Sequence, residues 1–89
     1  MKRKRTIYDI IADILEFVVA GGEARISYIS RYANLPIDRA NSLVEEMVRA
    51  GLLKLAEYEN HRIYKPSKNS YKYLAHYREL KKLLATIIK

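Results

Sequence analysis

Apolar residues near the start of the chain recur with the period of an amphipathic helix. They follow the i, i+3, i+4, i+7, i+8, i+11 spacing of a buried helical stripe, at Ile7, Ile10, Ile11, Ile14, Leu15 and Val18. Thr6 can cap the start of this helix, with Asp9 as its partner three residues later. Ala20-Gly21-Gly22 ends it, because glycine readily adopts the left-handed conformation that a helix end requires. A short strand is expected at 24–26.

Two further helices joined by a tight turn are predicted next. Ser27 can cap a second helix over 28–33, whose inward residues are Ile29, Tyr32 and Ala33. Asn34-Leu35 forms the turn, and Pro36 presets the first turn of a third helix, where its missing N–H costs nothing. This third helix is expected over 36–50, since Gly51 marks its end.

The third helix is amphipathic. At 100° per residue its inward face carries Ala40, Leu43, Val44 and Met47. Its opposite face carries Asp38, Ser42, Glu45 and Arg49, with Arg39 and Asn41 on the flanks.

After Gly51 the period of the pattern changes to two, which predicts a β-hairpin. Leu53 and Leu55 alternate with polar residues, and Ile63-Tyr64 forms a second short extended run. The polar segment Glu59-Asn60-His61 is predicted to be a three-residue turn between the strands. Pro66 ends the hairpin, because proline cannot donate to the ladder.

Ser67 can cap a final helix that is expected to run to the C-terminus. Its apolar residues are spaced 4, 3, 4, 3, as in a heptad seam, at Tyr73, Tyr77, Leu80, Leu84 and Ile87. A helix of about twenty residues spans roughly 30 Å, which is more than so small a body needs. The second half of the helix would therefore expose an apolar stripe, which predicts a homodimer. The flanking charges are nearly all positive, so an antiparallel pairing of the two helices is expected.

The order of elements predicts a mainly α fold with a small β-hairpin, the winged helix-turn-helix. The expected parts are a disordered basic arm over 1–5, the winged domain over 6–66 and a coiled-coil dimerisation helix over 67–89. In this fold the helix at 36–50 enters the major groove of DNA and the hairpin at 53–66 is the wing.

Composition narrows the functional class. The 89 residues suit one domain, and there is no cysteine for disulfide or thiol chemistry. The chain has only two histidines, far apart, so no zinc site is expected. It also lacks the paired carboxylates and the glycine-rich phosphate loop that would indicate catalysis or a cofactor. No apolar run reaches the roughly 20 residues that cross a bilayer. We therefore expect a non-enzymatic, cytoplasmic, nucleoid-associated protein with no metal, cofactor or membrane partner.

Charge is unevenly distributed along the chain. The net charge is +7, with +4 in residues 2–5, −4 in residues 6–61 and +7 in residues 62–89. Positive charge thus gathers at both ends of a slightly acidic body. Such clustering favours binding to a polyanion, and double-stranded DNA is the expected partner.

Residues 27–71 resemble the ArnR-like winged helix-turn-helix domains of archaea. The resemblance rests on Ser27-Tyr28-Ile29, Ala33-Asn34-Leu35, Ala50-Gly51-Leu52-Leu53 and Tyr64-Lys65-Pro66-Ser67. Short members of this family carry a long C-terminal helix that forms an antiparallel coiled coil in a homodimer, so the resemblance implies that role for the 73–87 seam. This chain differs in having Asn69 where members usually have glycine, and Pro36 where a hydroxyl often starts the third helix.

Candidate DNA contacts lie on the third helix and the wing. Arginine pairs with guanine and asparagine with adenine, so the base-reading candidates are Arg39, Asn41 and Ser42. The candidates for phosphate or minor-groove contact are Arg31, His61, Arg62, Lys65 and Lys68. Acidic residues at 38, 45 and 46 would repel phosphates, so we expect the helix to dock through its N-terminal half. Tyr28, Tyr32 and Tyr64 are assigned to core or strand faces, which disfavours base stacking.

Three functions stay open at this stage. The leading one is a transcriptional regulator that binds duplex DNA with sequence preference. The acidic residues of the third helix also allow an architectural protein with little base preference. Finally, winged helices can act as protein–protein interaction modules, and the acidic body could provide such a surface.

Overall fold

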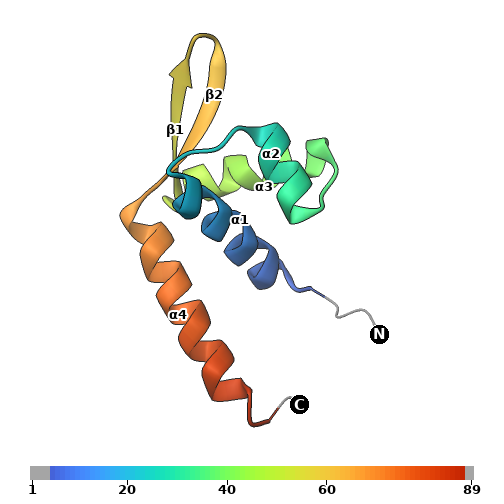
Figure 1. The fold of residues 1–89 in the computed structure, drawn as a ribbon, viewed down its shortest axis with the longest axis vertical. Helices are drawn as coiled ribbons and strands as arrows, with labels where there is room; N and C mark the ends of the chain where they lie inside the picture. The colour runs from blue at the N-terminus through green and yellow to red at the C-terminus, as the bar shows by residue number, and fades with distance from the viewer. Residues whose placement is uncertain (1–4, 88–89) are drawn as a thin grey trace.

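The computed structural model describes residues 5–87 and confirms the predicted mainly α fold with one hairpin. Its elements are α1 (Ile7–Gly21), α2 (Ile26–Ala33), α3 (Ile37–Arg49), β1 (Leu53–Tyr58), β2 (His61–Pro66) and α4 (Lys68–Leu84). The molecule is elongated, at 48 × 29 × 21 Å. The β1–β2 wing projects from one end and α4 extends toward the other (Figure 1). Four residues of the predicted basic arm, 1–4, lie outside the described residues.

Helix α1 is the centre of the core. Thr6 and Asp9 form the predicted capping box, and Gly22 ends the helix in the left-handed region with φ 81°. The buried residues of α1 are Ile10, Ala12, Ile14, Leu15 and Val18. Ile7, the first residue of the predicted stripe, is 44% exposed, so the buried face begins one turn later.

The α2–turn–α3 unit forms as predicted, but α2 begins earlier. Its first residue is Ile26 and its N-cap is Arg25, which makes no side-chain capping bond, so Ser27 lies inside the helix. Asn34 ends α2 with φ 58°, a left-handed conformation that asparagine tolerates. The inward assignment of Tyr32 is wrong. It is 53% exposed and stacks on Phe17, with ring centroids 4.7 Å apart.

The wing is an antiparallel hairpin with a shorter turn than expected. Glu59 and Asn60 both have positive φ, 50° and 66°, which gives a two-residue turn of the kind that matches strand twist. His61 is therefore the first residue of β2 rather than part of the turn. The strand predicted at 24–26 reduces to one bridge, with Ala24 and Tyr64 exchanging two backbone hydrogen bonds of 2.9 Å, because α2 already begins at Ile26.

The start of α4 is bonded to the loop after α3. The Ser67 hydroxyl donates to the Gly51 carbonyl at 2.7 Å, and the buried Ser70 hydroxyl donates to the Leu52 carbonyl at 2.6 Å. Asn69 also donates its amide to the Gly51 carbonyl, at 3.3 Å. The residue that differs from the family pattern thus supports the same junction.

The first half of helix α4 lies against α1 and is joined to it by hydrogen bonds. The Tyr73 hydroxyl donates to the Tyr8 carbonyl at 2.7 Å, and the Tyr77 hydroxyl donates to the Asp9 carboxylate. Burial raises the pKa of Tyr73. The helix ends at Leu84 and residues 85–87 form a turn, so it is shorter than the predicted helix to the C-terminus, whose residues 88–89 lie outside the described part. Within residues 5–87, no helix is both long and apolar enough to cross a membrane.

Candidate nucleic-acid interface

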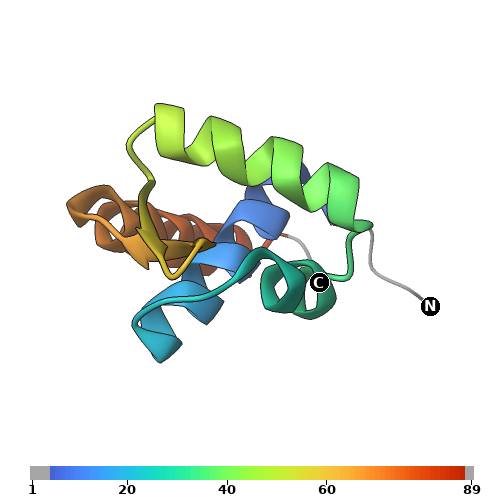
Figure 2. The same ribbon diagram turned by 90° about the horizontal axis from the view of Figure 1, so that it is seen from above.

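Helix α3 presents one face outward. Buried Ala40, Val44 and Met47 fix the helix against the core. Seen from above, α3 runs along one outer edge of the molecule (Figure 2). Arg39 and Ser42 are exposed as predicted, whereas Asn41 is half-buried. A helix face held in this way can enter a DNA groove without rearrangement of the core.

The outward side of α3 is mixed in charge. Its exposed acidic residues are Asp38, Glu45 and Glu46, and its exposed basic residues are Arg39 and Arg49. The carboxylates thus outnumber the guanidinium groups along the whole helix. Only Asp38 lies in the first turn, beside Arg39, so the acidic excess is greatest toward the C-terminal half.

The predicted wing cations are divided between two faces. Successive side chains of a strand point to opposite sides, so Arg62 shares one face with Tyr64 while His61 and Lys65 share the other. Arg62 faces α3, where its guanidinium lies 3.7 Å from the Glu45 carboxylate. The wing therefore presents one cation toward α3 and the others away from it.

Lys54 is a wing residue that sequence reasoning missed. It is the register partner of Lys65 on the adjacent strand, and both side chains are exposed. Like charges directly opposite in a hairpin are unfavourable by themselves, so an anion between them would relieve a repulsion. The expected three-residue turn would have placed Lys54 opposite Pro66, whereas the two-residue turn at 59–60 places it opposite Lys65.

The remaining predicted cations lie on separate elements. Arg31 is exposed on α2, with its guanidinium carbon 5.7 Å from the centre of the Tyr28 ring. Lys68 is exposed at the first residue of α4. Arg5, assigned to the disordered arm, instead donates to the Asp13 carboxylate at 3.0 Å and to the Ala33 carbonyl at 2.7 Å. The Arg5 side chain therefore bonds to both α1 and α2.

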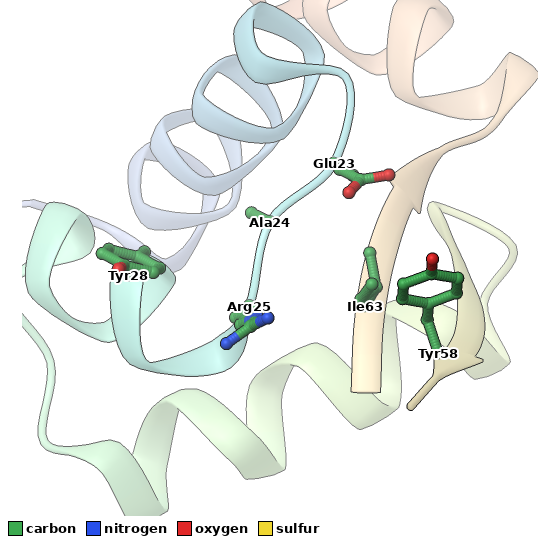
Figure 3. A pocket seen from close by; sticks show the side chains of 6 residues that line it. All are labelled: Glu23, Ala24, Arg25, Tyr28, Tyr58 and Ile63. Atoms are coloured by element: carbon green, nitrogen blue, oxygen red, sulfur yellow. The ribbon is translucent and has the colours of Figure 1, made fainter. Parts of the chain in front are cut away.

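A shallow hollow of about 280 Å³ lies beside the wing (Figure 3). Tyr28 comes from α2, Tyr58 and Ile63 come from the wing, and Glu23 and Arg25 come from the segment between α1 and α2. Tyr28 is 53% exposed, so its assignment to the core is wrong. The hollow has no grouping that indicates catalysis, and in residues 5–87 no three His, Cys, Asp or Glu side chains gather as a metal site would require.

A family model described as winged helix-turn-helix matches residues 4–85. The chain belongs to the winged helix-turn-helix family. This confirms, at the level of that family, the resemblance stated from the sequence. A search of curated protein sequences gave no match.

Solved structures share this winged helix fold. Sso10a-2, a DNA-binding protein from Sulfolobus solfataricus, has a TM-score of 0.81 at 19% identity, over 93% of this chain and 85% of its own. The oxidized form of MarR from E. coli has a TM-score of 0.72 at 8% identity, over 88% of this chain and 62% of its own. The plasmid segregation protein TubR has a TM-score of 0.66 at 12% identity, over 89% and 91%. At these identities the likeness concerns the fold.

The residues predicted for a dimer seam of this winged helix protein fall into two groups. Tyr73 and Tyr77 are half-buried and contact α1 of the same chain. Leu80 is 54% exposed and Ile87 is 74% exposed, while Leu84 is half-buried. Leu83, outside the predicted seam, is 66% exposed. Among these residues, the uncovered apolar side chains therefore lie at the end of α4 and in the turn that follows it.

Proposed function

We propose that this protein binds double-stranded DNA with α3 in the major groove and the wing on the adjoining backbone. The observation that carries the proposal is the first half of α3. Arg39 and Ser42 are exposed there, on a helix whose other face is fixed by buried residues. Asn41 is half-buried beside them, so we assign the leading base contact to Arg39.

The phosphate contacts are assigned to cations around this helix. Arg31 lies on α2, directly before α3, and Lys68 begins α4, directly after the wing; the wing adds Arg62, Lys65 and His61. Lys54 joins them because it is opposite Lys65. Contacts of this kind position the protein without reading sequence.

Dimerisation is the second part of the proposal. The exposed Leu80, Leu83 and Ile87 would be covered by the same region of a second copy. We assign an antiparallel arrangement to the two regions, with the exposed Lys81 and Lys82 of the last turn of α4 at the edge of the apolar contact. A dimer would bring two copies of α3 to one duplex, as suits a transcriptional regulator of the kind named among the solved structures of this fold.

A second candidate function is architectural DNA binding with little base preference. The exposed carboxylates of α3 favour it, because they outnumber the basic groups of that helix. Under this alternative the wing and α4 lysines supply the affinity through backbone contacts, which need no sequence.

The test compares a preferred duplex, selected from a random pool, with random duplex DNA by fluorescence anisotropy at two salt concentrations. Arg39→Ala should lose about 1–3 kcal/mol on the preferred duplex and much less on random DNA. Arg78→Ala, which removes an exposed arginine from α4, is the matched control. Equal losses on both duplexes would favour the architectural function. Wild-type protein that binds neither duplex at low salt would overturn DNA binding itself.

The wing is tested by the salt dependence. Affinity falls as salt rises, and replacing Lys54 and Lys65 together by alanine should make this fall less steep. The magnitude of the slope of log affinity against log salt should decrease by roughly one per lost phosphate contact. The weakening should be similar on preferred and random duplexes. An unchanged slope would show that this pair does not contact the backbone.

A further inference from the structure

A second hollow lies between the C-terminal half of α3 and the wing, and it carries charge. Its volume is about 220 Å³, and its lining residues are Glu45, Val48, Arg49, Leu55, Arg62 and Tyr64. Two of these are arginines that come from different elements, one from α3 and one from β2. Tyr64 is 1% exposed and forms one wall, and its backbone is paired with that of Ala24.

Glu45 lines the hollow together with these two arginines. It is four residues before Arg49 on the same face of α3, which makes their side chains neighbours. Across the hollow, its carboxylate lies 3.7 Å from the Arg62 guanidinium. Glu57 is the cross-strand partner of Arg62, so a second carboxylate faces this arginine from the wing.

The Glu45–Arg62 pair is weak enough to be exchanged. Its two side chains are 51% and 55% exposed, and exposed pairs of this kind contribute about 0–1 kcal/mol. A phosphate oxyanion offers arginine the same bidentate geometry as a carboxylate. The carboxylate of Glu45 therefore occupies the position beside the Arg62 guanidinium that a phosphate would take in this hollow.

We propose that this hollow is a binding site for one phosphate of the DNA backbone, held by Arg49 and Arg62, and that Glu45 fills the site in the free protein. The inference rests on the proposed DNA-binding function. Every duplex must then displace the Glu45 carboxylate from Arg62. Glu45 thereby lowers affinity for all DNA and leaves discrimination to the first half of α3.

The decisive variant is Glu45→Gln, with Glu46→Gln as its matched control. Both remove one exposed carboxylate from α3, but Glu46 is not among the lining residues. Glu45→Gln should strengthen binding to random duplex DNA by about three- to fivefold, the equivalent of an exposed ion pair. The control should change it by less than about twofold. Equal gains in affinity for Glu45→Gln and Glu46→Gln would mean that each carboxylate only repels DNA in general, which would contradict the site. Weaker binding by Glu45→Gln would overturn the proposal.

A double-mutant cycle tests whether Glu45 acts through Arg62. In an Arg62→Ala background, the gain from Glu45→Gln should fall to that of the control, because the arginine to be released is gone. Arg49→Ala should weaken binding and lower the salt slope by about one. A gain that persists without Arg62, or an Arg49→Ala variant with unchanged slope, would contradict the site.

Two further comparisons identify the ligand and separate the two proposals. At matched ionic strength, replacing chloride by inorganic phosphate should leave the Glu45→Gln gain unchanged if the ligand is the DNA backbone. A gain abolished already by low millimolar inorganic phosphate would show that the site prefers the free anion to the DNA backbone. Failure of the wild-type protein to bind duplex DNA would overturn the proposed function. Normal duplex binding in which Glu45→Gln gives the same change with and without Arg62 would overturn the phosphate site alone.

Discussion

The two halves of α4 lie in different surroundings although one spacing of apolar residues runs through both. In the first half, Ser70 and Leu74 are buried and the two tyrosine hydroxyls bond to α1. In the second half, Leu80 is 54% exposed and Leu83 is 66% exposed. The helix therefore leaves the domain part-way along its length, as its lower end in Figure 1 shows.

This difference changes the interpretation of the heptad seam. A 4-3-4-3 spacing identifies which residues share a helix face, but not what covers them. Tyr73 and Tyr77 have partners in their own chain, so only Leu80, Leu84 and Ile87 remain for a second copy. The proposed dimer interface is thus limited to Leu80 and Leu84 at the end of α4 and to Ile87 in the turn that follows, so we expect its stability to depend on concentration.

The largest expected effect separates the halves by their contribution to the fold. Leu74→Ala should lower the free energy of unfolding by about 2–5 kcal/mol, because Leu74 is 2% exposed and its removal leaves a cavity. Leu83→Ala, at an exposed position, should change it by less than about 0.5 kcal/mol in dilute protein. Urea denaturation measures both. A similar loss for the two variants would show that the second half is also packed on the domain.

The next effect separates the halves by their contribution to association. Replacing Leu80 and Leu84 together by glutamine should give a monomer with unchanged helix content. Its affinity for a two-site duplex should fall by about 10²-fold, since both domains no longer engage at once. Tyr71→Gln, at an exposed position of the first half, is the control and should leave sedimentation unchanged. A wild-type protein that sediments as a 10.4 kDa monomer at micromolar concentration would exclude this dimer.

Sequence reasoning succeeded where local signals decide the structure. The Thr6–Asp9 capping box, the left-handed residue at Gly22 and the buried face of α3 all follow from nearby residues. The Arg5 and Tyr77 contacts could not be predicted in this way, because Arg5 bonds across 28 residues and Tyr77 across 68. Only the packed fold brings these groups together.

The candidate site shows a different limitation. Arg62 and Lys65 were grouped because they are close in sequence, although three positions along a strand place them on opposite faces. The Arg62–Glu45 contact also depends on how the wing lies over α3, which no local pattern gives. Exposure of Tyr28 and Tyr32 was missed because the apolar bulk of tyrosine favours burial, whereas its polar hydroxyl favours the surface.

The smallest predicted effect concerns how firmly the first half of α4 is held, and it depends on pH. The Thr6 backbone N–H, together with the Tyr77 hydroxyl, lowers the pKa of Asp9 from 3.8 to about 2. The folded protein therefore binds the Asp9 proton less tightly than the unfolded chain does. The resulting stabilisation is complete well above the ordinary pKa of 3.8 and is lost as pH falls toward about 2.

Asp9→Asn should consequently lower the free energy of unfolding at pH 6 by on the order of 1 kcal/mol, because water screens a carboxylate at the surface. The difference from wild type should shrink between pH 5 and pH 2, where the wild-type carboxylate becomes neutral. Tyr77→Phe should raise the Asp9 pKa, which an NMR titration of the carboxyl group measures directly. Glu79→Gln, on the exposed second half of α4, should show no comparable loss at pH 6. A difference for Asp9→Asn that stays constant from pH 6 to pH 2 would mean that the charge of Asp9 does not hold α4 against α1.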